Sequence, residues 1–375
     1  MCRRVKKRNI QFLMWGVIYL SFSAFFFFAA AFLSGNLKKH TPAAIELYDA
    51  QGLNVSMEQA ASFAERGWFA AASVGEKIQV TDLEESKSVT AYYQTTTSNY
   101  GAYANLHFTE GGYFSADVSA EYAVVIPKSL SVELFAEKSG KKILYMNEIQ
   151  AVVCGVYEDG DLLVQLGSAN IPVIYGNAWK SSDLPAEHLL LEADAGKAAI
   201  QQKQETAVIM ETPLEGEMND FGRLHQLGDS ILLLGFFFSG LWFIFRFCIF
   251  SYHKFISAYE CKEPNAKRGF TAFLGLGVFF FTVIGFGFLL QLVRIPAVYL
   301  PENNIFDISY YGQEVLNGIQ QMNTDCRIMD FSRICAVYLC TEAGCLILAV
   351  PFFWAGCQRL RRGFLHGSIK EVKHF

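Results

Sequence analysis

The stretch NIQFLMWGVIYLSFSAFFFFAAAFLS, residues 9–34, contains no charged residue. It exceeds the roughly 20 residues that a helix needs to cross the hydrocarbon core of a bilayer. Three further segments, 231–252, 270–293 and 334–357, are of similar length and similarly apolar. The sequence therefore predicts four membrane-spanning helices, one near the N-terminus and three near the C-terminus.

The composition agrees with a membrane protein that also has a large water-facing part. Hydrophobic residues make up 52% of the 375 residues and charged residues 18%, but the apolar residues are concentrated in blocks. A pI near 5.9 argues against a nucleic-acid partner. The nine cysteines are too few and too scattered for a disulfide scaffold, although a bridge between Cys154 and Cys326 stays open.

The first apolar segment has a second possible interpretation. The basic run MCRRVKKR (1–8) and the small-residue stretch AAAFLSG (29–35) are also features of a secretory signal peptide. The apolar run, however, is longer than the roughly 7–15 residues of a signal-peptide core. We therefore expect an uncleaved anchor.

Lysine and arginine counts predict the orientation of the spans. Residues 1–9 contain five, loop 253–269 contains four and the tail 358–375 contains five, whereas loop 294–333 contains three. Short loops rich in Lys and Arg stay on the cytoplasmic side. We expect both termini and loop 253–269 to be cytoplasmic, and residues 35–229 and 294–333 to lie outside.

The expected fold class is an α-helical membrane protein with four transmembrane helices in a 1+3 arrangement and an inserted extracytoplasmic α+β domain. The expected parts are a basic N-terminus with the first span (1–34), the outside domain with a helical stalk at 185–225 (35–229), the bundle of three spans (230–357) and a basic tail (358–375).

Local patterns in the outside domain predict its elements. Ser56 followed by Gln59 is a capping-box pattern at the start of a helix, 57–66. Pro127 precedes a second helix, 128–138, that ends at Gly140. Alternating or apolar runs predict strands at 122–126, 142–146, 150–157 and 161–166, with EDGD (158–161) as a hairpin turn.

Residues 105–159 carry short motifs in a characteristic order. These are Gly111, Gly112, Tyr113 and Phe114, then 123–126, Leu134, Phe135 and Gly140, and finally Val153, Gly155 and Val156. Their order and spacing resemble the periplasmic core domain of MacB-like ABC transporter permeases, which are related to FtsX-like permeases. The resemblance implies that Gly112, Phe114, Phe135, Gly140 and Gly155 form a fold motif, because glycine permits tight turns and phenylalanine fills a core.

The resemblance implies a function for the whole chain. It would be the permease subunit of an ABC transporter in a bacterial inner membrane, paired with itself or with a second permease in the lipid. The chain has no phosphate-binding loop, since SGKK (139–142) has no Ser or Thr after its lysine. ATP hydrolysis is therefore expected on a separate ATPase, with no catalytic residue, metal or cofactor on this chain. A non-transporting FtsX-like signalling regulator and an ATPase-independent scaffold are the alternatives.

The cytoplasmic loop 253–269 contains the expected contact with the ATPase. Phe255, Ile256 and Tyr259 stand at helical spacing, and in permeases of this kind a short helix here docks into a groove on the ATPase. The loop keeps a positive charge but lacks the Arg-rich run leading to Gly-Ala-Ser that is typical of FtsX-like permeases. An amphipathic turn on the membrane surface would show the same spacing.

Two features within the spans are candidates for function. Glu342 lies eight residues into the last apolar segment, and a carboxylate at that depth predicts part of a conduit or an interhelical contact. If the helix began later, Glu342 would instead lie near the interface. Gly275, Gly277, Gly285 and Gly287 would let another helix approach closely, as a packing or dimer face, or would be filler among lipid-facing phenylalanines.

Overall fold

The structure is a computed structural model. It describes residues 2–65, 70–82, 87–114, 122–135, 142–146, 149–167, 171–177, 184–192, 194, 197–260, 265–293, 307, 309–310, 312–313, 316 and 331–371. The chain divides into two compact units: the first comprises residues 1–35, 226–305 and 339–375, and the second comprises 36–225 and 306–338.

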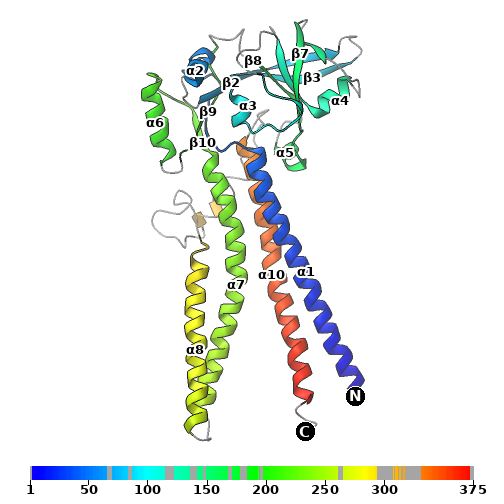
Figure 1. The fold of residues 1–375 in the computed structure, drawn as a ribbon, viewed down its shortest axis with the longest axis vertical. Coiled ribbons are helices and arrows are strands. Elements are labelled where there is room, and N and C mark those ends of the chain that lie inside the picture. The colour runs from blue at the N-terminus through cyan, green and yellow to red at the C-terminus, as the bar shows by residue number, and fades with distance from the viewer. Residues whose placement is uncertain are drawn as a thin grey trace. The chain divides into compact units, whose positions relative to one another are not determined.

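Four long helices dominate the first unit (Figure 1). They are α1 (Cys2–His40), α7 (Phe221–Glu260), α8 (Asn265–Leu290) and α10 (Phe331–Glu371). Each contains a segment that is long and apolar enough to cross a membrane. The prediction of four spans is confirmed. Residues at one end of α1, α7 and α10 belong to the second unit.

Helices α1 and α10 pack closely through glycine. A Cβ added to Gly16 would lie 2.7 Å from Cδ2 of Leu360, and one added to Gly356 would lie 2.8 Å from Cγ of Leu20. Further along the same pair, the Ser23 hydroxyl donates a 2.9 Å hydrogen bond to the Ala349 carbonyl. Small residues allow two apolar helices to approach closely where no hydrophobic force drives them together.

The glycines of α8 differ among themselves. A Cβ added to Gly275 or Gly285 would lie 3.4 Å from a side-chain atom of α7, whereas one added to Gly277 or Gly287 would meet nothing within 4 Å. Gly275 also accepts a 2.7 Å hydrogen bond from the Ser251 hydroxyl of α7. Gly275 and Gly285 therefore serve packing within the chain, and a dimer face formed by the four predicted glycines stays a prediction.

The second unit is an α+β domain. Its strands form a ten-stranded sheet in the order β10-β1-β9-β2-β3-β8-β5-β7-β4, with β6 paired to both β2 and β7. The strand bounds are β1 Ala44–Tyr48, β2 Ala70–Asp82, β3 Ser88–Thr96, β4 Phe108–Gly111, β5 Ala123–Pro127, β6 Ile143–Met146, β7 Ile149–Tyr157, β8 Val173–Asn177, β9 His188–Glu192 and β10 Glu217–Asp220. The fold class expected from the sequence is confirmed.

Part of the sheet closes on itself. Strand β2 pairs with β3 along one edge and with β6 at its far end, and β3, β8, β5, β7 and β6 pair in succession. These six strands and α4 (Lys128–Phe135) enclose one hydrophobic core, which includes Val80, Ile126 and Ile174. Strands β1, β9 and the start of β2 pack with α2 (Met57–Glu65) and α6 (Ala199–Ile209) around a second core.

Several predicted elements are confirmed. Helix α2 opens with the expected capping box: Gln59 N–H donates to the Ser56 hydroxyl at 3.2 Å, and the Gln59 side chain accepts from Ser56 N–H at 3.0 Å. Strands β5, β6 and β7 and helix α4 lie where the sequence predicts them.

Two predictions were wrong. Residues 161–166 form no strand after a hairpin turn but a helix, α5 (Leu162–Gly167), because the Asp161 carboxylate accepts hydrogen bonds from the first helical N–H groups. Residues 185–225 are not mostly helical, because they contain β9 and β10 beside α6 and the first residues of α7. Leu189, Leu190 and Leu191 of β9 are buried in the sheet.

Candidate functional site

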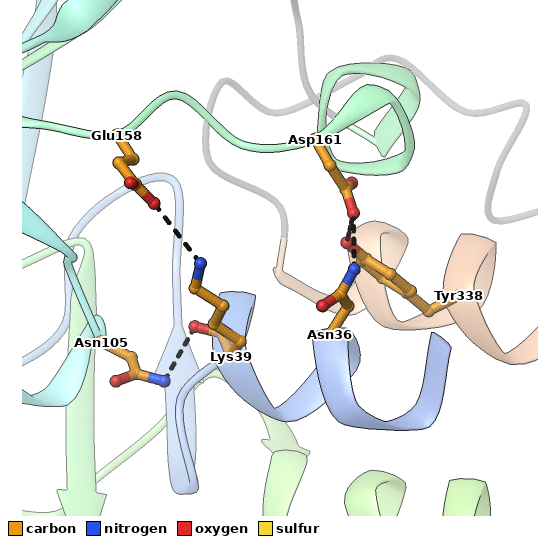
Figure 2. Close-up of polar contacts among 6 residues, drawn as sticks. All are labelled: Asn36, Lys39, Asn105, Glu158, Asp161 and Tyr338. Carbon is orange, nitrogen blue, oxygen red and sulfur yellow. Dashed lines mark hydrogen bonds and ion pairs between the residues drawn. The ribbon is translucent and has the colours of Figure 1, made fainter. Parts of the chain in front are cut away.

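The candidate site lies where the ends of α1 and α10 meet two loops of the α+β domain (Figure 2). We call it the helix-end site. It consists of Asn36, Lys39, Asn105, Glu158, Asp161 and Tyr338, all of which belong to the second unit.

Asp161 is the centre of this site. One carboxylate oxygen, Oδ1, accepts hydrogen bonds from Leu163 N–H at 3.0 Å and Val164 N–H at 3.1 Å, which caps α5. The other oxygen, Oδ2, accepts from the Asn36 amide at 3.2 Å and from the Tyr338 hydroxyl at 2.6 Å. A single carboxylate therefore connects α1, α5 and α10.

These bonds favour the ionised form of Asp161. Partial burial acts to raise the pKa of this carboxyl, but the hydrogen bonds from Tyr338, Val164 N–H and Leu163 N–H, together with the nearby His40, outweigh it and lower the pKa below 3.8. The carboxylate is therefore charged at neutral pH. Hydrogen bonds to a charged acceptor are stronger than those between neutral groups.

Asn105 caps the end of α1. Its side-chain amide donates to the carbonyls of Lys38 at 3.0 Å and Lys39 at 2.8 Å. Helix C-termini leave carbonyl groups without an intrahelical partner, and this amide satisfies two of them. Asn105 has φ 55°, a left-handed conformation that asparagine tolerates better than most residues.

Lys39 and Glu158 form a weaker contact at the rim of the site. Their charged groups are 3.4 Å apart, and the side chains are 43% and 49% exposed. Exposed ion pairs contribute about 0–1 kcal/mol. The Glu158 backbone is held independently, because its N–H donates to the His107 carbonyl at 2.7 Å.

The start of α7 contacts the residues that follow the same end of α1. Thr41 donates its hydroxyl proton to the Leu37 carbonyl at 2.5 Å and lies 2.7 Å from Nε2 of His225. Since the threonine hydroxyl has a single proton, His225 is the donor in the second contact and carries hydrogen on Nε2. Both side chains are buried. Strands β1 and β10, which adjoin the two helices, pair antiparallel with Ile45 opposite Asp220.

Helices α7 and α10 also meet directly. The rings of Phe221 and Phe331 pack edge to face with centroids 5.8 Å apart, and both are buried. The His40 ring stacks on Tyr338 at 6.3 Å, which adds a second contact between α1 and α10. The ends of three long helices therefore form one packed group with the α+β domain.

A cavity of about 390 Å³ adjoins this group. Its walls come from α1, α5, α10 and the loops around residues 104–107, 157–160 and 171–173. The lining is mixed and includes His40, His107, Glu158, Asp159, Tyr157, Ile171, Phe331 and Ile334. Within the described part of the chain, no group of three or more His, Cys, Asp or Glu side chains could hold a metal ion.

The residues predicted to dock an ATPase lie far along α7. Phe255, Ile256 and Tyr259 occupy its last turns, because α7 runs without a break to Glu260. They are therefore part of the long helix and form no separate short one. Phe255 is 39% exposed, and the side chain of Tyr259 lies outside the described residues.

Glu342 lies well inside α10, which begins at Phe331, and its side chain is 0% exposed. The helix does not begin later, because α10 already starts at Phe331, but a position of Glu342 near the membrane interface stays a prediction beside a position within the span. A functional role for this buried carboxylate stays a prediction.

The glycines of the predicted fold motif meet different environments. A Cβ added to Gly112 would meet nothing within 4 Å, whereas one added to Gly155 would overlap the Gly112 carbonyl oxygen. The neighbouring Gly111 has φ 64°, and a Cβ there would overlap the Cys154 carbonyl oxygen. Gly111 and Gly155, which face each other across β4 and β7, are the positions where glycine is required.

The aromatic residues of the motif are buried. Phe114 is 4% exposed and stacks on Tyr113 with centroids 4.2 Å apart, and Phe135 belongs to the core enclosed by the six strands. Gly140 lies outside the described residues.

The sequence analysis missed the helix-end site. An aspartate directly before an apolar run is a helix start signal, and this pattern at Asp161 would have indicated α5. The contacts to Asn36 and Tyr338 join residues 125 and 177 positions away along the chain. No local sequence pattern indicates a contact between residues that lie so far apart along the chain.

Comparisons with known proteins gave structural matches only. No family model and no curated protein matches the chain. The structure is similar to that of the periplasmic region of MacB from Actinobacillus actinomycetemcomitans, with a TM-score of 0.39 and 13% identity over 51% of this chain and 95% of that one. It is also similar to the extracellular domain of the noncanonic ABC-type transporter YknZ from Gram-positive bacteria, with a TM-score of 0.35 and 14% identity over 46% of this chain and 98% of that one.

Proposed function

We propose that the chain is the permease subunit of an ABC transporter, which couples ATP hydrolysis by a separate ATPase to movement of its own α+β domain for export or extraction of a substrate. The observation that carries this proposal is the helix-end site. There, helices that are long enough to span a membrane bind directly to loops of the α+β domain.

The connections are short enough to transmit a displacement. Helix α1 ends at His40 and β1 begins at Ala44, while β10 ends at Asp220 and α7 begins at Phe221. Helix α10 is connected through its side chain Tyr338 to Asp161. A tilt or shift of any of these helices would therefore act on the sheet or on α5 without a flexible linker between them.

The sequence motifs of residues 105–159 indicate the class of protein. Their resemblance to MacB-like permeases supports a partner ATPase, a second permease copy or homologue, and a bacterial inner membrane. The Lys and Arg distribution supports cytoplasmic termini and an α+β domain outside the cell membrane. Under this proposal the chain has no catalytic residue of its own.

Two predicted positions take roles in this proposal. Phe255, Ile256 and Tyr259 would dock the ATPase at the end of α7 opposite the helix-end site. Glu342 would serve as an intramembrane contact that changes during the cycle, so Glu342→Gln should lower ATP-dependent transport while assembly persists. Unchanged transport by that variant would remove the role of Glu342.

Affinity purification from native membranes in a mild detergent tests the proposal. We expect an ABC ATPase to co-purify in near-stoichiometric amount, and Phe255→Asp to reduce its recovery about tenfold, the effect of losing roughly 1.4 kcal/mol of binding. Ser257→Asp is the matched control, because Ser257 is also exposed at the same end of α7 but is not among the predicted docking residues.

Other outcomes point to other functions. Recovery of a cell-wall hydrolase or a sensor kinase that responds to this chain, without transport, would favour the signalling regulator. Intact protein that brings down no ATPase would contradict the permease proposal and leave a scaffold. This test is needed because loop 253–269 lacks the Arg-rich run that is typical of FtsX-like permeases, where the ATPase would dock.

A further inference from the structure

Helix α5 exposes two leucines on one side. Leu162 and Leu166 are 69% and 57% exposed and stand four residues apart, so they lie one above the other on the helix surface. The intervening Leu163 and Val164 are half-buried, and Val164 lines the cavity beside the helix ends. The helix therefore packs one apolar side against the domain and leaves a second apolar side uncovered by the described residues.

The helix-end site fixes where α5 lies relative to the ends of α1 and α10. Asp161, the residue before α5, is hydrogen-bonded to Asn36 and Tyr338 on those helices. Six helical residues span about 9 Å at 1.5 Å per residue. Leu162 and Leu166 therefore lie within roughly that length, plus the reach of a side chain, of the end of α1.

This distance matches the thickness of the polar region of a bilayer. The apolar run of α1 ends at Ser34, two residues before Asn36. Each polar headgroup layer is about 5–8 Å thick, and surface helices bury their apolar side at its boundary with the acyl chains. Lys38 and Lys39 are both exposed at this end of α1, four and five residues beyond the end of the apolar run.

We infer that Leu162 and Leu166 insert into the boundary between headgroups and acyl chains of the outer leaflet, so that α5 is a membrane-contacting foot of the α+β domain. The inference rests on the proposed membrane location of the four helices. Because those helices already anchor the chain, the foot meets lipid at high effective concentration, and two leucines suffice where a free peptide would not bind.

The foot adds a lipid contact to the helix-end site. Asp161 connects α5 to α1 and α10, so any displacement of these helices at Asn36 or Tyr338 is resisted by the leucines in the lipid. The outer leaflet thus becomes a reference surface for movement of the α+β domain.

Site-specific photo-crosslinking tests the inference in the full-length chain. Benzoylphenylalanine is placed at position 166 and the protein is reconstituted in nanodiscs of phosphatidylethanolamine and phosphatidylglycerol. Position 281, where Phe281 is 79% exposed on α8, is the positive control for lipid. Position 79 on β2, where Gln79 is exposed, is the control for an exposed strand position of the same domain.

Mass spectrometry then counts lipid adducts at each position. We expect position 166 to give lipid adducts within about threefold of position 281, and position 79 at least about tenfold fewer, since reactive lipid extends only through the headgroup layer. Adducts at position 281 without adducts at position 166 would overturn the inference that α5 contacts lipid, but would still support the membrane location of the four helices. Adducts to a second copy of the chain at 166 would replace lipid by a protein interface. Lack of adducts at 281 would remove the membrane location and the foot together.

Discussion

Helices α1 and α10 contact their surroundings in two different ways. Within the apolar segments, Gly16 and Gly356 let the two helices approach at van der Waals distance, and the contacts are made by leucines and backbone, with one hydrogen bond from Ser23. At the helix-end site, the same two helices use Asn36 and Tyr338 to donate hydrogen bonds to one carboxylate. The contacts within the apolar segments depend mainly on how well the surfaces fit, whereas those at the helix-end site depend on the direction of hydrogen bonds.

The two kinds of contact respond differently when the helices move. Contacts based on shape tolerate small shifts as long as the volume stays filled, because dispersion attraction is spread over many weak atom pairs. Hydrogen bonds to Asp161 weaken steeply when angle or distance changes. The apolar segments can therefore shift slightly against each other, while the helix ends stay bonded to the α+β domain.

The largest expected effect comes from Asp161→Ala. The substitution removes four hydrogen bonds, including the cap of α5, and we expect it to lower the free energy of unfolding by about 3 kcal/mol. Asp159→Ala is the matched control, because Asp159 bonds only to Ser129 among the contacts described here and should cost about 1 kcal/mol. Denaturant unfolding in detergent micelles measures both. Equal losses would mean that Asp161 does not connect the helix ends.

The next effect tests the contact based on shape. Gly16→Leu forces a side chain into Leu360 and the backbone of α10, so we expect a loss of about 2 kcal/mol from overpacking. Gly277→Leu introduces the same side chain where nothing lies within 4 Å, and its effect should stay near zero. A similar loss for the two variants in the same unfolding assay would show that α1 and α10 do not pack through Gly16.

A third prediction concerns pH. Because the folded pKa of Asp161 is lowered, its stabilisation is present above a pH of about 4 and is lost as the pH falls through the folded pKa. Tyr338→Phe removes the hydrogen bond that contributes most to the lowering, so we expect a loss of about 1.5 kcal/mol at pH 7 that becomes smaller toward pH 3. Unfolding midpoints of both proteins across this range measure the change. A gap that stays constant with pH would contradict the assignment.

The smallest effect is expected at the rim. Lys39→Ala breaks an exposed ion pair with Glu158 and should cost about 0.5 kcal/mol or less. Added salt should abolish the difference from the wild type, because exposed charges are screened. A loss above 1 kcal/mol that persists in high salt would contradict this, and would mean that Lys39 and Glu158 stabilise the helix-end site as the hydrogen bonds to Asp161 do.

The sequence predicted those parts of the fold whose causes are local. A run of about 20 apolar residues needs no partner to be recognised as a span, and the capping box at Ser56 and Gln59 is contained within one helical turn. Strands β5 and β7 were found because Val and Ile are concentrated there. Strand β2 gives a weaker signal, because alanine, glycine and charged residues interrupt its pattern. Strands β1 and β3 contain Ile, Val, Thr and Tyr, which favour strands, and were missed although their composition indicates them.

The candidate site was beyond local reasoning. Phe255 and Ile256 were identified from helical spacing and from the resemblance to permeases, whereas Asp161 was assigned to a turn and a strand although it caps a helix. Its role depends on Asn36 and Tyr338, which chain folding brings to it from both ends of the sequence. The sequence analysis named Gly111 only as part of the motif shared with MacB-like permeases. Its positive φ in the structure shows why glycine is required at this position.

The central claim is that ATP-driven motion reaches the α+β domain through the helix-end site. The most direct test is hydrogen–deuterium exchange of the chain reconstituted with the proposed ATPase partner, with and without a nonhydrolysable ATP analogue. We predict that the analogue changes exchange at the α5 amides of Leu163 and Val164 in the wild type, and that Asp161→Ala abolishes the response while the ATPase stays bound. An identical response in the two proteins, or an analogue that leaves α5 unchanged in the wild type, would contradict the account.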